Sequence, residues 1–415
     1  MPAMPRERVP DSTLAILLDP YRFIARRCRA HQSPVFEARI LLRKTICMSG
    51  PDTAELFYDK NRFTRLGAAP LRVQKTLFGQ GGVQGLDGAS HLQRKQMFMS
   101  LMTPAEVVRL AATTNDWWDT YARRWQRVES VVLYDEVREL LTRAVCAWAG
   151  VPLNEEEVGR RTHELPALFD YAGNVGPKHW LSHRARARAE RWVAATVEDV
   201  RAHRYRPAAG TAAHVIAWHR EKGELLSPRI AAVELLNALR PPVAVAVYIT
   251  FIAHALHEHP DWRFGLEDSE DVRNEQFVQE VCRFYPFFPS VIALVPDDFE
   301  WCGYRFPRGR RVILDLYGTN HHPQTWDAPE TFRPERFQDW KPSAFNFIPQ
   351  GGGDHYTGHR CAGEWITIEL MKTALHWLAA RLEYDVPQQD LTSDYRRLPA
   401  LPRSRFVMRD LSVRA

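Results

Sequence analysis

Cys361 stands at the end of a glycine-rich segment, residues 350–363, and just before a helical pattern that runs from Ile366 to Leu382. Free backbone N–H groups and the positive end of the dipole at a helix start favour a thiolate, and Arg360 adds positive charge. Thiolates bind metal ions, so Cys361 is a candidate metal ligand. Two alternatives remain open: a small buried core cysteine, and a zinc site with His355 and His359 that lacks an obvious fourth ligand.

Arg240 interrupts the apolar helical pattern between Pro228 and His259 and is followed by Pro241 and Pro242. An interior proline costs a helix roughly 3 kcal/mol, so the pattern predicts either two helices with Arg240 in solvent or one kinked helix. In the second case the guanidinium lies among apolar neighbours and needs an anion, because an unpaired buried charge is very costly. That anion could be a substrate.

Two charged motifs follow. Glu280 and Arg283 stand three residues apart on one expected helix face, and Pro334-Glu335-Arg336-Phe337 lies downstream. Taken alone, an i, i+3 ion pair is typical of a solvated helix surface.

The order of these motifs, ending in Cys361-Ala362-Gly363, resembles the cytochrome P450 superfamily. The resemblance implies a mainly α cytochrome P450 fold with a minor β-sheet. It also implies a heme b cofactor whose iron is bound by the Cys361 thiolate. Glu280, Arg283 and Arg336 would then form a structural charge network supporting the heme-binding core.

The cysteine loop departs from the general pattern: the family carries Phe seven residues and Gly four residues before the ligand, where this chain has Asp354 and Thr357. Residues 237–242 read Asn-Ala-Leu-Arg-Pro-Pro and lack the acid-alcohol pair that delivers protons to iron-bound dioxygen in oxygen-activating members. An enzyme without that relay should need an oxidant already reduced by two electrons.

The Arg240-Pro241 pair, the loop at Gln350 and Gly351, and the glycine-rich stretch around Gln84 are similar to the bacterial fatty-acid peroxygenases of that superfamily. Residues 142–150, 284–289 and 384–387 resemble the α-hydroxylating member of the group. The resemblance implies a hydrogen-peroxide-dependent heme-thiolate enzyme. It would hydroxylate long- or medium-chain fatty acids at the α-carbon, with some β product, and need no redox partner protein.

The same resemblance assigns roles to further residues. Arg240, with Pro241 beside it, would pair with the substrate carboxylate, which would itself act as general acid and base. Gln84 stands where alkene-forming relatives carry histidine, which favours hydroxylation over decarboxylation. Heme contacts would come from His91, Lys95, Arg65, Gln350 and Gly351, and the substrate tunnel walls from Leu77, Phe78, Phe169, Phe287 and Phe288.

Plainer interpretations stay open for these side chains. Gln84 could bond its own backbone in a turn, His91 and Lys95 could form an exposed helical pair, and each apolar residue could simply pack in the core. At the level of function, the alternatives are a monooxygenase driven by a reductase and NAD(P)H, and a heme protein that binds fatty acids without turnover.

The elements that must position these residues are mostly helical. Apolar residues at three-and-four spacing predict helices at 21–31, 52–58, 89–102, 105–124 and 134–148, whereas strands are expected only at 35–41, 311–314 and 406–408. No Ser/Gly-rich linker or repeat divides the chain, so we expect a single domain over residues 1–415.

Composition narrows the function classes. Hydrophobic residues make up 45% of the chain and charged residues 25%, which excludes a disordered or low-complexity protein. The formal net charge of +5 is spread without a basic stripe, so nucleic-acid binding is not indicated. The apolar run from Val243 to Leu256 is too short for a membrane span of about 20 residues, and the N-terminal residues lack the apolar core of a secretory signal. A cytoplasmic location is therefore expected.

Overall fold

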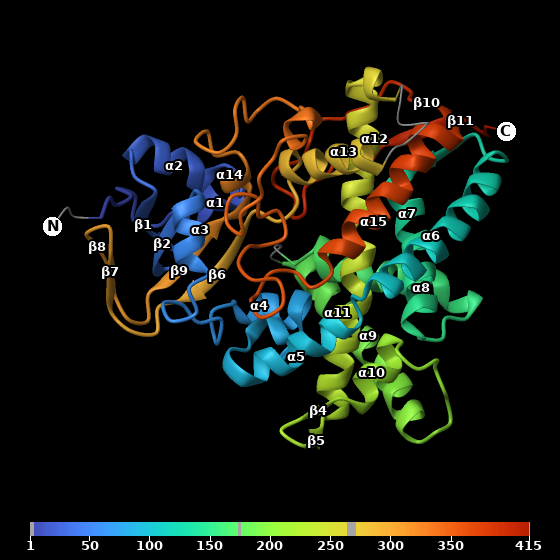
Figure 1. Cartoon of the computed structure of the whole chain (residues 1–415), viewed down its shortest axis with the longest axis horizontal. Coiled ribbons are helices and arrows are strands. Elements are labelled where there is room, and N and C mark those ends of the chain that lie inside the picture. Colours follow the sequence, from blue (N-terminus) through green and yellow to red (C-terminus); the bar gives the residue numbers. More distant parts are fainter. Residues whose placement is uncertain (1–3, 173–175, 264–270, 415) are drawn as a thin grey trace.

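The computed structural model describes residues 4–172, 176–263 and 271–414. A smaller part built on a β-sheet and a larger helical part lie side by side (Figure 1). Helices dominate, so the expected fold class, mainly α with a minor sheet, is confirmed.

The main sheet has four strands in the order β1-β2-β9-β6. Its strands β1 and β2 form an antiparallel hairpin, β9 pairs with β2 in parallel, and β6 pairs with β9 antiparallel. All five residues of β9 are buried, because this strand is central and covered on both faces. The bounds are Val35–Ile40 (β1), Arg43–Ser49 (β2), Ser290–Leu294 (β6) and Arg311–Asp315 (β9).

Smaller strand pairs lie outside this sheet. A three-stranded sheet has the order β10-β11-β3, and two hairpins are formed by β4 with β5 and by β7 with β8. Their bounds are Ser130–Val132 (β3), Arg220–Glu221 (β4), Glu224–Leu225 (β5), Phe299–Trp301 (β7), Tyr304–Phe306 (β8), Leu382–Asp385 (β10) and Val407–Val413 (β11).

The α-helices form two groups. Those around the main sheet are Thr13–Leu18 (α1), Phe23–His31 (α2), Pro51–Phe57 (α3) and Leu316–Asn320 (α14). The remaining helices are Leu71–Val73 (α4), Gly88–Ser100 (α5), Pro104–Trp125 (α6), Leu133–Ala149 (α7), Glu155–Asp170 (α8), Pro177–Arg201 (α9), Ala212–Trp218 (α10), Pro228–Ala244 (α11), Ala246–Glu258 (α12), Asp271–Phe284 (α13) and Glu364–His376 (α15).

Five short helical turns have other geometries. The π-helical segments are Gln74–Phe78 (η1) and Trp377–Arg381 (η5). The 3-10 segments are Val83–Gly85 (η2), Pro260–Trp262 (η3) and Pro334–Phe337 (η4).

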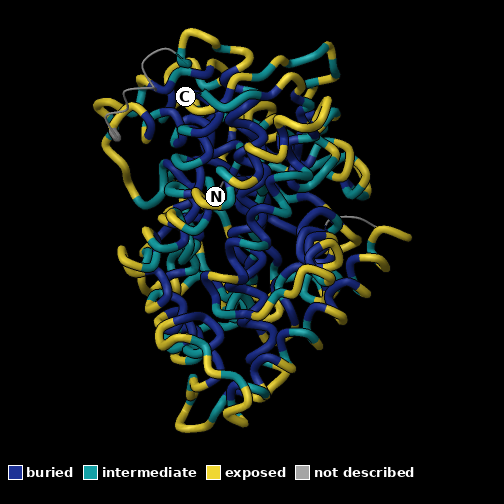
Figure 2. Tube along the Cα trace, turned by 90° about the vertical axis from the view of Figure 1, so that its right-hand side faces the viewer, coloured by how far each residue is buried: buried dark blue, intermediate teal, exposed yellow. Residues whose placement is uncertain are grey.

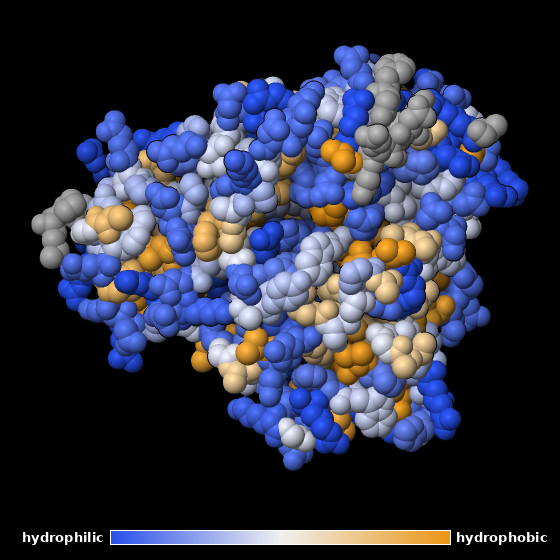
Figure 3. Space-filling view, in the orientation of Figure 1, coloured by the Kyte–Doolittle hydropathy of each residue, from blue (hydrophilic) through white to orange (hydrophobic). Residues whose placement is uncertain are grey.

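Helices α11 and α12 form the centre of the helical part. Together they give one apolar stretch, Pro228–Glu258, that is long and apolar enough to cross a membrane by length and composition alone. However, 94% of its most apolar window is buried inside the protein, as is typical of a core helix. Figure 2 shows buried chain mainly inside the molecule and exposed chain mainly at its periphery. The face drawn in Figure 3 is mainly hydrophilic, with scattered apolar patches.

The helix break expected at Arg240 lies elsewhere. Helix α11 continues through Pro241 and Pro242 to Ala244, and α12 begins two residues later at Ala246. Arg240 is 7% exposed, so its guanidinium lies inside the protein and the solvent-exposed alternative is wrong. Packing on all sides of this helix offsets the cost of its two prolines.

Candidate functional site

Cys361 lies at the turn that leads into α15, two residues before the helix N-cap Gly363. Its backbone N–H donates to the carbonyl of Gln350 at 3.2 Å, which ties the two ends of the glycine-rich loop together. Burial raises the pKa of the Cys361 thiol, whereas the backbone N–H of Gly363 and the charges of Lys95 and Arg240 lower it. These three groups oppose the desolvation cost of a thiolate at this position.

Arg360 plays a smaller part at the cysteine than the sequence suggests. Its guanidinium is held by Glu364, with Nε–Oε2 and Nη2–Oε1 distances of 2.6 Å. The ion pair neutralises much of the positive charge expected beside Cys361, and Lys95 and Arg240 are the neighbouring cations that lower the thiol pKa.

The zinc alternative does not fit the geometry. His355 packs against Trp365, with ring centroids 4.3 Å apart, while Nε2 of His359 lies 3.2 Å from Oδ1 of Asp87. Within the described residues, no group of three or more His, Cys, Asp or Glu side chains could hold a metal ion. Protein side chains alone therefore offer no zinc site at Cys361.

The glycine-rich loop before Cys361 packs closely against Tyr58 and Ala344. Gly351 has a φ of +93°, which L side chains rarely adopt, and a Cβ on it would lie 3.1 Å from the hydroxyl of Tyr58. A Cβ on Gly352 would lie 2.5 Å from the carbonyl oxygen of Ala344. Beside this bend, Oε1 of Gln350 is buried and has no hydrogen-bond partner among the described residues. The loop therefore brings bare backbone and an unsatisfied amide next to the cysteine.

Lys95 is a buried cation without a carboxylate partner in the described part of the chain. It is 4% exposed, and its Nζ donates to the carbonyl of Arg360 at 2.5 Å. Burial lowers the pKa of Lys95 to about 8. Because an isolated buried charge is costly, this position fits an anionic group of a ligand.

His91 and Arg65 are two further basic side chains near Lys95 and His359. His91, one turn before Lys95 on α5, is buried and packs on the ring of His359 at a centroid distance of 4.0 Å. Arg65 lies 4.2 Å from the ring centroid of Phe57, and its Nη1 donates to the carbonyl of Ile292 at 2.9 Å. Among the described residues neither side chain pairs with a carboxylate. The exposed-pair alternative for His91 and Lys95 is wrong, since both are buried.

Arg240 also lacks a carboxylate within the described structure. Its Nη1 donates to the carbonyl of Leu77 in η1. Burial and, to a smaller extent, the neighbouring Arg186 lower the pKa of Arg240 to about 9, with Cys361 and Glu234 opposing part of the shift. The guanidinium thus stays charged at neutral pH and lies within electrostatic reach of the cysteine thiol.

Gln84 bonds to α11 instead of its own turn. Its Oε1 accepts from Nδ2 of Asn237 at 3.3 Å, one helical turn before Arg240. Asn237 in turn donates to Oε2 of Glu234 at 2.9 Å, and Nη1 of Arg94 lies 2.8 Å from Oε1 of the same carboxylate. Arg94, Glu234 and Asn237 were not predicted from the sequence as site residues. The signal available was a carboxylate inside the apolar pattern at residues 231–239, which requires a partner.

The five expected tunnel residues all lie at one hydrophobic cluster. Leu77 and Phe169 are buried members of it, while Phe78, Phe287 and Phe288 are half-buried and pack against it. Phe287 stacks on Tyr248 at a centroid distance of 4.4 Å and meets Phe288 edge-on at 4.7 Å. Phe169 is 1% exposed and lies inside this cluster.

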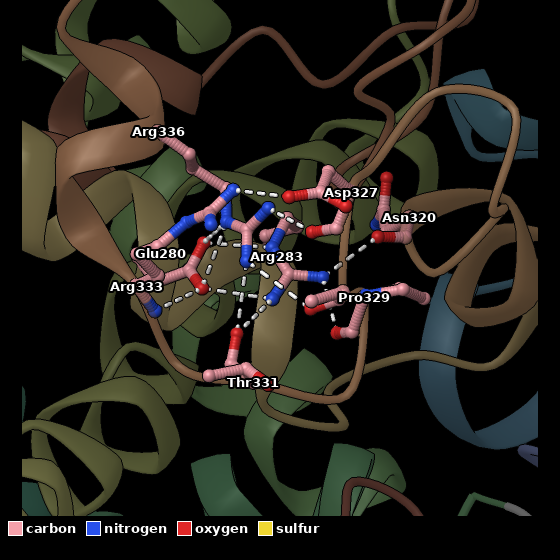
Figure 4. A network of polar contacts seen from close by, with 9 residues as sticks. Glu280, Arg283, Asn320, Asp327, Pro329, Thr331, Arg333 and Arg336 are labelled. Carbon is pink, nitrogen blue, oxygen red and sulfur yellow. Dashed lines mark hydrogen bonds and ion pairs between the residues drawn. The ribbon is translucent and has the colours of Figure 1, made fainter.

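Glu280, Arg283 and Arg336 form one buried network (Figure 4). Nε of Arg283 lies 2.7 Å from Oε2 of Glu280, and Nε of Arg336 lies 3.2 Å from the same carboxylate. Arg283 also donates to the carbonyls of Asn320 and Pro329. Glu280 and Arg283 are 0% exposed, so the surface-pair alternative is wrong. The network joins α13 to the segment that precedes the cysteine loop.

The residues around Cys361 fit a heme. The sulfur of Cys361 can bind the iron, and the closely packed glycine loop can accept the flat ring. The two carboxylates of the cofactor can pair with basic side chains that have no carboxylate partner among the described residues, namely Arg65, His91 and Lys95. The unsatisfied Gln350 amide lies in the same region.

Comparisons with known proteins agree with this geometry. The family model of cytochrome P450 matches residues 274–407. The structure of Cytochrome P450SP alpha (CYP152B1) in complex with ibuprofen is 56% identical, with a TM-score of 0.96 over 98% of this chain and 100% of that one. Cytochrome P450EX alpha (CYP152N1) with myristic acid is 46% identical, with a TM-score of 0.96 over 100% of both chains.

Curated relatives outside this group match more locally. Cytochrome P450 76A2 of Solanum melongena is 31% identical over 159 residues, which cover 37% of this chain and 30% of that protein. This chain thus spans less than a third of the plant relative's length, whereas it spans the full length of the two CYP152 structures. The chain belongs to the cytochrome P450 family, in its CYP152 group, and its cofactor is heme b with the iron bound by a cysteine thiolate.

Proposed function

We propose that this protein hydroxylates fatty acids at the α-carbon with hydrogen peroxide as oxidant and without a redox partner protein. The observation that carries the proposal is Arg240: a buried guanidinium with no carboxylate among the described residues, within electrostatic reach of Cys361. A fatty acid supplies one carboxylate and an apolar chain. Those are the two features that Arg240 and the cluster around Leu77 and Phe288 can bind.

Cys361 is the proposed iron ligand, and Arg65, His91 and Lys95 are the proposed partners of the two heme carboxylates. When bound, a thiolate-ligated heme supplies cleavage of the peroxide O–O bond and transfer of one oxygen atom to a C–H bond. Gln350 and Gly351 would contact the cofactor next to Cys361. Glu280, Arg283 and Arg336 are proposed to hold the cysteine loop in place.

Arg240 has two roles in the proposal. Its guanidinium binds the carboxylate, which fixes the adjacent α-carbon and leaves the far end of the chain loosely specified. It also holds the carboxylate where that group can take a proton from one peroxide oxygen and return it to the other. Helix α11 offers no acid of its own for this transfer, because both oxygens of Glu234 are engaged, one by Arg94 and one by Asn237.

Pro241 and Gln84 support this arrangement in different ways. Pro241 has no N–H, so the carbonyl of Asn237 loses its usual helical donor next to Arg240. Gln84 is neutral at every working pH and is bonded to Asn237, so it cannot offer the proton equilibrium of a histidine. We expect hydroxylation to outcompete decarboxylation for this reason.

One product analysis tests the proposal. Purified protein receives myristic acid with either hydrogen peroxide or NAD(P)H plus a reductase, and mass spectrometry locates the new hydroxyl group. We expect 2-hydroxymyristic acid from peroxide alone, and none from Arg240→Ala, which should retain heme. As a control, the exposed Arg123→Ala variant should behave like wild type. Product only with reductase would make the protein a monooxygenase, no product would make it a binding protein, and mid-chain alcohols would refute the carboxylate anchor.

A further inference from the structure

A second buried guanidinium lies beside Arg240. Arg186 on α9 is 3% exposed, and its Nε lies 2.7 Å from Oε1 of Glu190, one turn further along the helix. Its Nη1 donates to the carbonyl of Leu77 at 3.2 Å. That carbonyl also accepts from Nη1 of Arg240, so two arginines from different helices converge on one oxygen atom.

The chain around Leu77 is shaped to receive Arg186. Gly79, directly after η1, has a φ of +82°, and a Cβ on it would lie 2.1 Å from Nη2 of Arg186 and 2.5 Å from Cγ1 of Val233. Neither the backbone conformation nor the available space admits a larger residue here. The guanidinium thus packs directly on the bend that carries Leu77 and Phe78, and its buried Nη2 has no hydrogen-bond partner in the part of the chain that the structure describes.

The positive charges of Arg186 and Arg240 are not balanced by an equal number of carboxylates in the described structure. Arg186 has one carboxylate contact, with the half-buried Glu190, and Arg240 has none within the described residues. The other buried carboxylate nearby, Glu234, is bonded to Arg94 and Asn237. Each guanidinium thus raises the free-energy cost of keeping the other charged and buried. Accordingly, Arg186 is among the causes that lower the pKa of Arg240. A singly charged anion at Arg240 would relieve this repulsion.

We propose that Arg186 is a positioning residue for the substrate carboxylate, an inference that rests on the proposed binding of that carboxylate by Arg240. Its positive charge strengthens the attraction for the anion. Its hydrogen bond keeps the Leu77 carbonyl satisfied when Arg240 turns from that oxygen to the carboxylate, because a buried acceptor left without a donor is costly. Glu190 moderates the effect by neutralising part of the Arg186 charge.

The proposal predicts opposite effects from the two members of the Arg186–Glu190 pair. Arg186→Gln removes a positive charge, so the Kd for myristic acid should rise about tenfold. Glu190→Gln leaves Arg186 without its counter-charge, so the same Kd should fall about threefold. Arg186→Lys keeps the charge and should remain within about threefold of wild type. A pair that only stabilised the fold would give weaker binding in both neutral variants.

Isothermal titration of the heme-loaded enzyme in the absence of peroxide measures these constants. Myristic acid is compared with 1-tetradecanol, which has the same chain and no charge, and the Kd of the alcohol should change less than twofold in every variant. Equal weakening for acid and alcohol, or weaker acid binding in Glu190→Gln, would overturn the proposal. If Arg186→Gln does not fold, Glu190→Gln and Arg186→Lys still decide the question.

Arg240→Ala separates this inference from the proposed function. If Arg240→Ala binds myristic acid like wild type, the carboxylate anchor itself is wrong. If Arg240→Ala weakens binding of the acid and Arg186→Gln does not, the anchor stands and only the role of Arg186 is refuted.

Discussion

The six cysteines show how surroundings separate a ligand from a packing residue. Cys28, Cys47, Cys146 and Cys282 are buried, and burial raises the pKa of each thiol, whereas Cys302 is exposed. Cys361 differs from the buried four because a backbone N–H at a helix start and two neighbouring cations oppose the effect of burial on its pKa. These are the conditions under which a thiolate is stabilised.

Replacing Cys361 with Ser should therefore abolish the thiolate-type absorption band of the ferrous carbon monoxide complex. Cys282 is a matched control, since it is buried on α13 and its Sγ lies 3.6 Å from the sulfur of Met371. Cys282→Ala should keep the band. A thiolate-type band in Cys361→Ser would show that another cysteine binds the iron.

Lys95→Met should have opposite effects in the presence and absence of heme. In the cofactor-free protein, burial lowers the pKa of Lys95 from 10.5 to about 8, so below pH 8 the folded state carries an unfavourable charge. At pH 7 the free energy of unfolding of the variant should therefore be about 1–3 kcal/mol higher than that of wild type. Because the folded state loses the proton first, this advantage should shrink as the pH rises from 8 to 10.5.

Once heme is bound, Lys95 should have an anionic partner, and the same substitution should speed heme loss by about tenfold. Urea unfolding of the cofactor-free protein at pH 7 and pH 10, and heme transfer to an acceptor protein, measure the two effects. The exposed Lys75→Met variant is the control. Unchanged heme loss would show that Lys95 does not contact the cofactor.

Sequence alone identified the residues with distinctive local motifs, but not their partners. Cys361 and Arg240 stand out through a helix start and a proline pair. Arg186 does not, because it is one of several arginines along α9 and its contact with Leu77 spans 109 positions of the chain. Such contacts depend on how helices pack, which the pattern along a single helix does not contain.

At the scale of elements, α11 shows how packing overrides local preference. Two successive prolines remove two backbone donors, so the pattern predicted an end or kink at Arg240. The helix nevertheless continues to Ala244, because Leu235, Leu236, Leu239 and Val243 are fully buried along it. The break between the two helices lies after this point, at Val245, directly before the start of α12.

The network that joins α13 to η4 should dominate stability among the charged pairs. Glu280→Gln leaves Arg283, which is 0% exposed, without its carboxylate, and breaking such a pair costs about 3–5 kcal/mol. Asp119→Asn breaks the exposed i, i+4 pair with Arg123 and should cost less than about 0.5 kcal/mol. Equal loss in the two variants, measured by chemical unfolding, would contradict the structural role of Glu280.

At the scale of the whole molecule, the sequence predicted the helices with strong periodicity and most of their bounds to within two residues. The expected helix at 105–124 is α6, Pro104–Trp125, and that at 134–148 is α7, Leu133–Ala149. The sheet order could not be derived in this way. Strand β9 lies parallel to β2, with Ile313 opposite Cys47, and no local pattern specifies a pairing across that separation.

Removing heme should loosen one region of the molecule and leave another unchanged. The sheet β1-β2-β9-β6 is stabilised by hydrophobic clusters of its own, which include Val35, Ile46 and Leu314. The cofactor is expected to contact α5 and residues 350–363, where, among the described residues, Lys95 has no carboxylate partner and Oε1 of Gln350 has no hydrogen-bond partner. Heme binding should therefore stabilise those segments by linkage.

Hydrogen exchange followed by mass spectrometry, with and without heme, measures this difference. Peptides from α5 and from residues 350–363 should exchange at least about tenfold faster without heme, while peptides from β2 and β9 should change by less than about twofold. The contrast follows because local opening exposes only the amides whose contacts depend on the missing ligand. Equally faster exchange in all four regions would instead show that the sheet and the heme-binding part unfold as one cooperative unit, and that the sheet's own clusters are insufficient to hold it.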